Sequence, residues 1–319
     1  MVDCFGRKID YLRVSITDSC DLRCKYCMPR GIEKKDSADI LSFEEITEIC
    51  KTASELGIKY IRLTGGEPLA RKGIEKLISM LRAIDNIERI TMTTNGVRLG
   101  ENLNRLLSAG LDGVNISLDT LDRDKYKSIT GFDCLNRVIN NLNTAYESGI
   151  AVKVNAVLIE ENVDECLSII ELAKDRKIDV RFIEMMPIGE GKNFCSIDCK
   201  RVLDIIKQSY PSIYDVNEEI GAGPAKYYHI PGFEGNIGFI NAVHESFCYK
   251  CNRIRLTSTG FLKACLCYDK GADLNFVLRN DNGRLKDIIK EVIMSKPEGH
   301  CFKEADNITE YKSMRQIGG

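Results

Sequence analysis

Three cysteines lie close together near the start of the chain, in the segment Ser-Cys-Asp-Leu-Arg-Cys-Lys-Tyr-Cys. Cys20, Cys24 and Cys27 have the spacing C-x3-C-x2-C and follow an apolar, alternating run at residues 11–16 that is typical of a strand. Three thiolates in one loop can bind three irons of a cubic iron–sulfur cluster. The remaining iron then stays open for a ligand that the protein does not supply, such as a substrate that receives an electron.

Zinc and inert thiols are the alternatives for this loop. A structural zinc site needs four ligands, and no histidine or fourth cysteine lies near the loop. Disulfides form mainly in oxidising compartments, and the first residues of the sequence lack the apolar stretch of a secretion signal. The total of 14 cysteines points to metal or redox chemistry, so we favour an open iron–sulfur cluster.

A second group of three cysteines lies in the last third of the chain. Cys248, Cys251 and Cys265 have the spacing C-x2-C-x13-C, which again offers three ligands for a cluster. A zinc ribbon with Cys267 as the fourth ligand is the alternative. The single residue between Cys265 and Cys267 makes joint ligation by these two thiols awkward.

The elements that must position these cysteines alternate between strands and helices. Polar or Gly-rich segments follow successive strands, where α/β barrels place their active sites. We therefore expect an α/β fold with a partial (βα)6 barrel of the TIM type, and an open Rossmann-type sheet is the competing architecture. The sequence predicts strands at 10–16, 59–64, 89–94, 113–118, 151–158 and 178–183, and helices at 43–56, 73–84, 101–109, 134–148 and 164–176.

The pattern changes in the last third of the chain. The break Gly-Ala-Gly-Pro at 221–224 predicts a boundary between a barrel core, residues 1–221, and a C-terminal region, residues 222–319. Short strand-like pieces and one amphipathic helix at 285–294 follow this break. We expect a small, irregular α+β region that covers the open mouth of the barrel and carries the second cysteine group.

Composition limits the partners of this chain. The 319 residues are 44% hydrophobic and 29% charged, as in ordinary globular proteins. The net charge of −2 gives no argument for nucleic-acid binding, and no apolar run approaches the length of a membrane span. We expect a cytoplasmic protein that binds neither nucleic acid nor membrane.

The first cysteine loop resembles the signature of the radical S-adenosylmethionine (SAM) superfamily. Further motifs follow in one order along the chain: Thr-Gly-Gly-Glu-Pro, Arg-Phe-Ile-Glu-Met-Met, Gly-Pro-Ala, Cys-Asn-Arg-Ile-Arg-Leu-Thr and a terminal Ile-Gly-Gly. With both cysteine groups, this set resembles the GTP 3′,8-cyclase family over essentially the whole chain. Gly-Gly-Glu-Pro alone is common among radical SAM enzymes, whereas the complete set is specific.

The resemblance implies an activity, its cofactors and its partners. Each cysteine group would hold a [4Fe-4S] cluster, and the first cluster would cleave SAM to a 5′-deoxyadenosyl radical. This radical would abstract H3′ of GTP, and ring closure on C8 would give (8S)-3′,8-cyclo-7,8-dihydroguanosine 5′-triphosphate, the first step of molybdenum cofactor biosynthesis. The family further suggests an external reductant, a downstream cyclic pyranopterin monophosphate synthase and a homodimer. A two-cluster radical SAM enzyme that modifies a peptide is the alternative function.

The resemblance also assigns roles to individual residues. Glycine at 65 and 66 leaves the backbone open to the amino-acid end of SAM, and Glu67 would orient that region. The residues expected to contact SAM are Tyr26, Gly66, Ser117 and Met186. Those expected to bind GTP, whose triphosphate needs fixed cations, are Arg13, Arg62, Thr93, Lys153, Arg253, Ile254 and Arg255. Catalytic roles fall to Arg253, Arg255 and a tail that enters the active site, Gly318 and Gly319.

Overall fold

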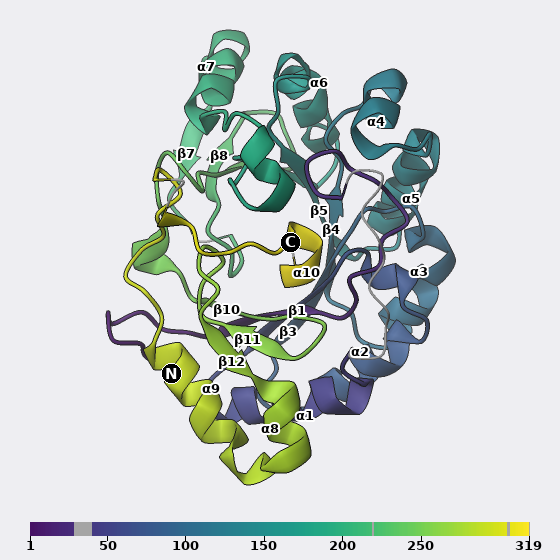
Figure 1. Cartoon of the computed structure of the whole chain (residues 1–319). Coiled ribbons are helices and arrows are strands. Elements are labelled where there is room, and N and C mark those ends of the chain that lie inside the picture. Colours follow the sequence, from purple (N-terminus) through teal and green to yellow (C-terminus); the bar gives the residue numbers. More distant parts are fainter. Residues whose placement is uncertain (29–39, 219, 305–306, 319) are drawn as a thin grey trace.

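One continuous sheet runs through the computed structural model, which describes residues 1–28, 40–218, 220–304 and 307–318. Its strands follow the order β12-β11-β10-β1-β2-β3-β4-β5-β6-β9-β8-β7 (Figure 1). All neighbours from β10 to β9 are parallel, and the outer pairs are antiparallel. Among the described residues, no pairing joins β7 to β12, so the barrel is open.

The strands predicted from the sequence form the centre of this sheet. They are β1 (Tyr11–Ser15), β2 (Tyr60–Thr64), β3 (Arg89–Thr94), β4 (Gly113–Ser117), β5 (Ala151–Val157) and β6 (Asp179–Ile183). Each pairs in parallel with the next along the chain. The prediction of a partial (βα)6 barrel is therefore confirmed.

Helices cover the outer face of the curved sheet (Figure 1). The first begins with a capping box, in which Ser42 and Glu45 satisfy each other's backbone N–H groups. Alternate strand residues such as Leu12 and Val14 are fully buried in the apolar core against these helices. The helices are α1 (Phe43–Glu55), α2 (Ile74–Arg82), α3 (Leu99–Ser108), α4 (Arg123–Thr130), α5 (Leu135–Glu147), α6 (Cys166–Ile170) and α7 (Cys199–Ser209).

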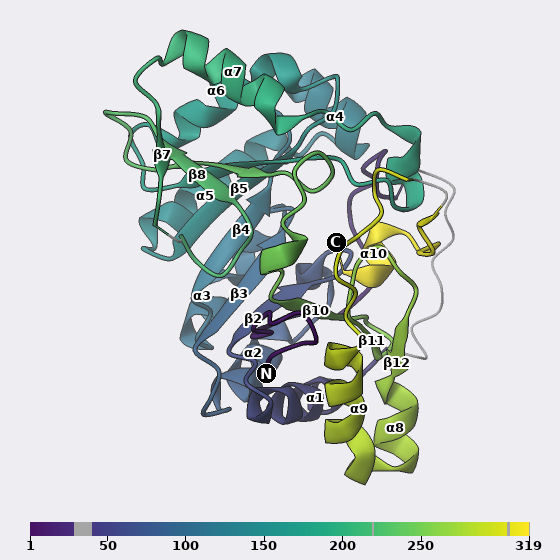
Figure 2. The same ribbon diagram turned by 90° about the vertical axis from the view of Figure 1, so that its left-hand side faces the viewer.

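The C-terminal region adds strands to both edges of the central sheet. β10 pairs with β1, and β9 pairs with β6. The short helix α10 lies inside the curve of the sheet, whereas α8 and α9 lie outside it beside α1 (Figures 1 and 2). The elements are β7 (Tyr214–Val216), β8 (Lys226–His229), β9 (Ile237–Ile240), β10 (Arg253–Leu256), β11 (Phe261–Lys263), β12 (Gly271–Asp273), α8 (Leu274–Asn280), α9 (Leu285–Met294) and α10 (Met314–Ile317).

Two parts of this arrangement differ from the sequence expectation. The helix expected at 164–176 is only α6, flanked by 3-10 turns at Val163–Glu165 and Glu171–Ala173. The residues of β10 belong to a motif beside the second cysteine group, and the sequence analysis did not predict a strand there. None of the helices in the described part of the chain has the length and apolarity that a membrane crossing requires.

Candidate active site

A row of arginines lies on the inner face of the sheet. Side chains alternate between the two faces of a strand, so the burial of Leu12 and Val14 on the outer face leaves Arg13 on the inner one. The strand register pairs Arg13 with Arg62 of β2 on one side and with Arg255 of β10 on the other. Segments from both ends of the chain thus bring three guanidinium groups together.

The electrostatics of this row favour an anion. Burial lowers the pKa of Arg13, and repulsion from Arg255 and Arg62 lowers it further. Burial, followed by repulsion from Arg253, lowers the pKa of Arg255 to about 10. Within the described residues, Arg62, Arg253 and Arg255 form no ion pair with a carboxylate.

Two buried polar atoms, one in this row and one on the neighbouring strand β3, have no hydrogen-bond partner in the described structure. They are Nε of Arg62 and Oγ1 of Thr93. Buried polar atoms are normally hydrogen-bonded. A bound polyanion such as a triphosphate would give the guanidinium its missing acceptor, and a hydroxyl of the same ligand would satisfy Thr93. The interior of the barrel therefore fits an anionic, hydroxylated ligand.

The remaining predicted GTP residues differ in what they offer. Lys153 donates to Asp179 Oδ2 at 2.6 Å and to Tyr227 Oη at 2.9 Å, so its charge is already shared. Ile254 is completely buried in the apolar core and pairs with Leu12 of β1, so its side chain is not offered to a ligand.

Sequence reasoning missed Arg181 as a member of this interior. The residue lies on β6, is buried, and donates to Oδ1 of Asn155 at 2.9 Å and to Oδ1 of Asn115 at 2.7 Å. A basic residue inside an apolar strand was the signal that singled out Arg13. The same signal is present at Arg181, within the strand predicted at 178–183.

The three thiols of the first loop converge. Burial is the largest cause of the raised pKa values of Cys20 and Cys24, and repulsion adds to it: Cys27 raises the pKa of Cys20, and Cys27 and Cys20 raise that of Cys24. Burial raises the pKa of Cys20 to about 12 and that of Cys27 to about 11. Buried thiols become thiolates when a metal ion supplies the compensating charge, so this loop fits an iron–sulfur cluster.

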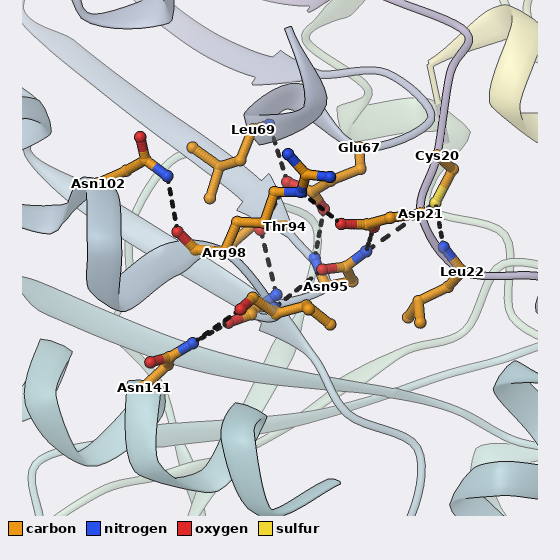
Figure 3. Close-up of polar contacts among 12 residues, drawn as sticks. Cys20, Asp21, Leu22, Glu67, Leu69, Thr94, Asn95, Arg98, Asn102 and Asn141 are labelled. Carbon is orange, nitrogen blue, oxygen red and sulfur yellow. Dashed lines mark hydrogen bonds and ion pairs between the residues drawn. The ribbon is translucent and has the colours of Figure 1, made fainter. Parts of the chain in front are cut away.

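A hydrogen-bonded network fixes the first cysteine to the neighbouring strand ends (Figure 3). The buried Glu67 accepts from Thr94 Oγ1 at 2.8 Å and from the N–H of Asn95 at 2.7 Å. The amide of Asn95 donates to Asp21 Oδ1 at 2.7 Å and approaches the sulfur of Cys20 at 3.9 Å. Burial raises the pKa of Glu67 to about 7.

The two glycines after β2 serve the packing of the cysteine loop. A Cβ on Gly65 would lie 2.4 Å from the carbonyl oxygen of Thr17, and one on Gly66 would lie 2.4 Å from that of Ser19. The N–H of Gly66 also donates to the carbonyl of Thr17 at 2.7 Å. Glycine is therefore required here for close backbone approach, in addition to the expected access for SAM.

Three predicted SAM residues lie in the cysteine loop or at the carboxyl ends of strands. Tyr26 donates its hydroxyl to Asp119 at 2.6 Å, and Asp119 also accepts from the N–H of Val157 at 2.8 Å. The ring of Tyr26 is thereby fixed. Ser117 ends β4 and Met186 follows β6, and both are half-buried.

The second cysteine group lies beside two positively charged side chains, Arg253 and Lys296. Burial opposes ionisation of Cys251, but the charges of Arg253 and Lys296 outweigh it and lower its pKa to about 6. Cys265 interacts electrostatically with Cys251 and Cys248, so these three thiols also converge. A thiolate that is stable near neutral pH is ready to bind metal.

Cys267 has a different environment. Its sulfur lies 3.2 Å from that of Cys301, and it belongs to a small buried apolar cluster that includes Ile317.

The last described residues of the chain lie inside the curve of the sheet (Figure 1). Arg255 Nη1 donates to the carbonyl of Gly318 at 3.0 Å, and Arg315 Nη1 donates to the carbonyl of Asp18 at 3.3 Å. Gly318 has a φ of 76°, and a Cβ there would lie 2.9 Å from Oγ1 of Thr64. Glycine is thus needed at 318, and Gly319 lies outside the described residues.

The fold and the first cysteine loop define the class of this protein. The sequence pattern of the Radical SAM superfamily matches residues 14–196, and that of Molybdenum Cofactor Synthesis C matches residues 178–302. The chain therefore belongs to the radical SAM superfamily, whose enzymes use SAM and an iron–sulfur cluster.

Within that superfamily, the chain belongs to the GTP 3′,8-cyclase family. It is 45% identical over 323 residues to the GTP 3′,8-cyclase of Clostridium perfringens (strain 13 / Type A), with 100% of each chain covered. It is 43% identical over 325 residues to that of Alkaliphilus oremlandii, again with 100% of each chain covered. The resemblance proposed from the motifs is confirmed.

A solved structure supports the fold. SuiB of Streptococcus suis bound to S-adenosylmethionine aligns with a TM-score of 0.66 at 17% identity, covering 97% of this chain and 78% of that chain. At this identity the likeness concerns the fold alone.

Proposed function

We propose that this protein is a GTP 3′,8-cyclase that catalyses the first step of molybdenum cofactor biosynthesis. The observation that carries the proposal is the buried arginine row on β10, β1 and β2. Its member Arg255 interacts electrostatically with Cys251 and Cys265 of the second cysteine group, and β1 leads directly into the loop of the first group. A nucleoside triphosphate matches this arrangement because its phosphates need several fixed cations while its base and sugar remain free to react.

The arginines hold the substrate. Arg13, Arg62 and Arg255 bind the triphosphate, since guanidinium groups donate paired hydrogen bonds to phosphate oxygens. Thr93 offers a hydroxyl to the same ligand, and Arg253, Ile254 and Lys153 complete the predicted set. When bound at Cys20, Cys24 and Cys27, the cluster and SAM supply the 5′-deoxyadenosyl radical that removes H3′ from GTP.

The chain orients SAM at the carboxyl ends of the strands. Tyr26 is held by Asp119 at 2.6 Å in the position proposed to face the adenine. The backbone at Gly66 and at Met186, together with Ser117, completes the proposed contacts.

A second [4Fe-4S] cluster is proposed at Cys248, Cys251 and Cys265. The lowered pKa of Cys251, caused by the charges of Arg253 and Lys296, supports this assignment. A cluster held by these three cysteines would offer a coordination position to the guanine base, and holding the base while the ribose reacts would make ring closure intramolecular. Arg253, Arg255, Gly318 and Gly319 would complete the catalytic machinery around that step.

Anaerobic reconstitution with iron and sulfide, followed by SAM, GTP and a reductant, tests this function through the product formed. We expect (8S)-3′,8-cyclo-7,8-dihydroguanosine 5′-triphosphate.

Alanine at Cys20, Cys24 and Cys27 together is expected to abolish SAM cleavage and leave about half of the iron. Alanine at the second group is expected to halve the iron while sparing some uncoupled SAM cleavage. SAM cleavage by the first triple variant would contradict the assignment.

Other parts of the sequence-based expectation stay predictions. They are the division into residues 1–221 and 222–319, the cytoplasmic location, the homodimer, the external reductant and the downstream cyclic pyranopterin monophosphate synthase.

A further inference from the structure

A buried ion pair ties the end of the chain to the sheet. Lys263 on β11 and Glu310 in the terminal segment both have side chains only 2% exposed, and the ammonium contacts Glu310 Oε2. The other carboxylate oxygen of Glu310 accepts from the N–H of Lys312 at 2.7 Å. The backbone N–H of Glu310 donates to the carbonyl of Cys267 at 3.3 Å. Glu310 is therefore fixed through both side chain and backbone.

The strand register links this ion pair to the active site. Lys263 is the antiparallel partner of Arg255 in the β10–β11 pair. Arg255 donates to the carbonyl of Gly318 at 3.0 Å. Neighbouring residues on adjacent strands thus bind two points of one short segment, its start at Glu310 and its end at Gly318.

The residues between these two points make further stabilising contacts. Ser313 and Gln316 form a capping box at the start of α10, which limits fraying of this short helix. Arg315 donates to the carbonyl of Asp18 in the first cysteine loop at 3.3 Å. The terminal segment is therefore held at Glu310, at Arg315 and at Gly318.

We propose that Lys263 and Glu310 are positioning residues that hold the terminal segment, residues 310–318, in the active site. This inference rests on the proposed cyclase function and deepens it. A buried ammonium without its carboxylate is costly in a low-dielectric interior. Loss of Glu310 would therefore drive Lys263 toward solvent and displace the terminal segment, while both cysteine groups keep their ligands.

The test uses the full-length, reconstituted enzyme with Glu310→Gln, which keeps the shape of the side chain and removes its charge. We expect iron content and 5′-deoxyadenosine formation like those of the wild type. The cyclised product formed per 5′-deoxyadenosine should fall about tenfold or more. Hydrogen exchange at the amides of residues 314–318 should accelerate, which a general loss of stability would not confine to this segment.

Glu55→Gln is the matched control, because Glu55 pairs with Lys286 on the surface at 2.8 Å. It should leave both readouts unchanged. Lys263→Met is the second variant, since the Glu310 left behind can bind a proton and avoid an unpaired charge. We expect the same uncoupling, and exchanging the two residues (Lys263→Glu with Glu310→Lys) should restore part of the coupling.

Wild-type coupling and wild-type exchange in Lys263→Met would overturn the proposal, even where Glu310→Gln fails to fold. If the wild-type enzyme forms no cyclised product from GTP, the proposed function fails. The hydrogen exchange of residues 314–318 would then still decide whether the ion pair anchors this segment.

Discussion

At the scale of single residues, Glu67 links the first cysteine loop to two strand ends. Its carboxylate is buried, accepts from Thr94 and Asn95, and has its pKa raised to about 7 by burial. A carboxyl group with a raised pKa keeps its proton to a higher pH in the native state than in the unfolded state. Its contribution to stability is therefore present below the ordinary value of 4.5 and is lost as pH rises through 7.

We predict that Glu67→Gln removes this pH dependence. Between pH 5 and 8 the free energy of unfolding of the wild type should fall by about 2–3 kcal/mol more than that of the variant. Denaturant unfolding under anaerobic conditions measures this difference. Because glutamine also disturbs the network, the variant is expected to be less stable throughout, and only the slope with pH tests the prediction. Parallel slopes would mean that Glu67 is ionised at all these pH values.

The second prediction concerns the ligand count of the second cysteine group. Cys267→Ala should leave the iron content of the reconstituted protein unchanged, because the sulfur of Cys267 lies 3.2 Å from Cys301 within an apolar cluster. Cys265→Ala is the matched comparison, and it should lower iron toward one cluster per chain. Iron analysis and absorption spectra distinguish the two variants. Equal loss in both would make Cys267 a ligand.

Candidate site residues could be predicted from the sequence where the signal lies in their immediate sequence neighbours. Arg13 and Arg62 stand out as basic residues inside apolar strands, and the cysteine spacings define their own loops. The partners of Glu67 were not predictable, because Thr94 and Asn95 approach it only through the pairing of β2 with β3. The ion pair of Lys153 with Asp179 likewise depends on the register of β5 and β6.

At the scale of elements, β10 is the part of the site that local patterns could not place. Its four residues, Arg253–Leu256, form no long apolar run, and their partner β1 lies near the other end of the chain. The six central strands were predictable because each is flanked by a helix of clear periodicity. The Arg-x-Arg motif predicted a phosphate-binding role for these residues, but it did not predict that they form a strand beside Arg13.

We predict that β10 contributes two of the cations that hold GTP. Replacing Arg253 and Arg255 together by glutamine should weaken GTP binding or turnover while cluster content stays unchanged. The loss of each charge-assisted hydrogen bond costs about 1.5–3 kcal/mol, or about ten- to a hundredfold in affinity. Equilibrium binding of GTP to the reconstituted protein measures the effect. The paired change of Lys286 and Lys290 on α9 to glutamine is the control, and wild-type affinity in the Arg253/Arg255 variant would exclude β10 from the substrate site.

The fourth prediction concerns the segment that ends with α10. Deletion of Gly318 and Gly319 should leave folding, both clusters and uncoupled SAM cleavage intact, because Ile317 and the preceding residues keep their packing. Cyclised product should be lost, since Arg255 then lacks the carbonyl that it binds at 3.0 Å. Product analysis with 5′-deoxyadenosine as the internal reference tests this. A peptide ending in Ile-Gly-Gly, added in trans, should restore part of the activity, and full activity of the truncated protein would make the tail dispensable.

At the scale of the whole molecule, both edges of the predicted barrel core are covered by later segments. β10 covers β1 and β9 covers β6. We therefore predict that a chain ending at residue 221 aggregates, because it exposes two unpaired parallel edges. Size-exclusion chromatography of this fragment, beside the full-length chain, checks the prediction. A monodisperse, folded fragment would show instead that residues 1–221 are an independent domain.

The pairing of β1 with β10 also has a consequence for folding during synthesis on the ribosome. Contacts between residues far apart along the chain form late, because the entropy cost of closing a large loop must be met before these contacts can stabilise the fold. Tyr11 meets Arg253 only after nearly four-fifths of the polypeptide has been synthesised. The nascent protein can thus close the first cysteine loop long before it can complete the proposed triphosphate site. The order of synthesis therefore separates the assembly of the proposed radical-generating site from that of the proposed substrate site.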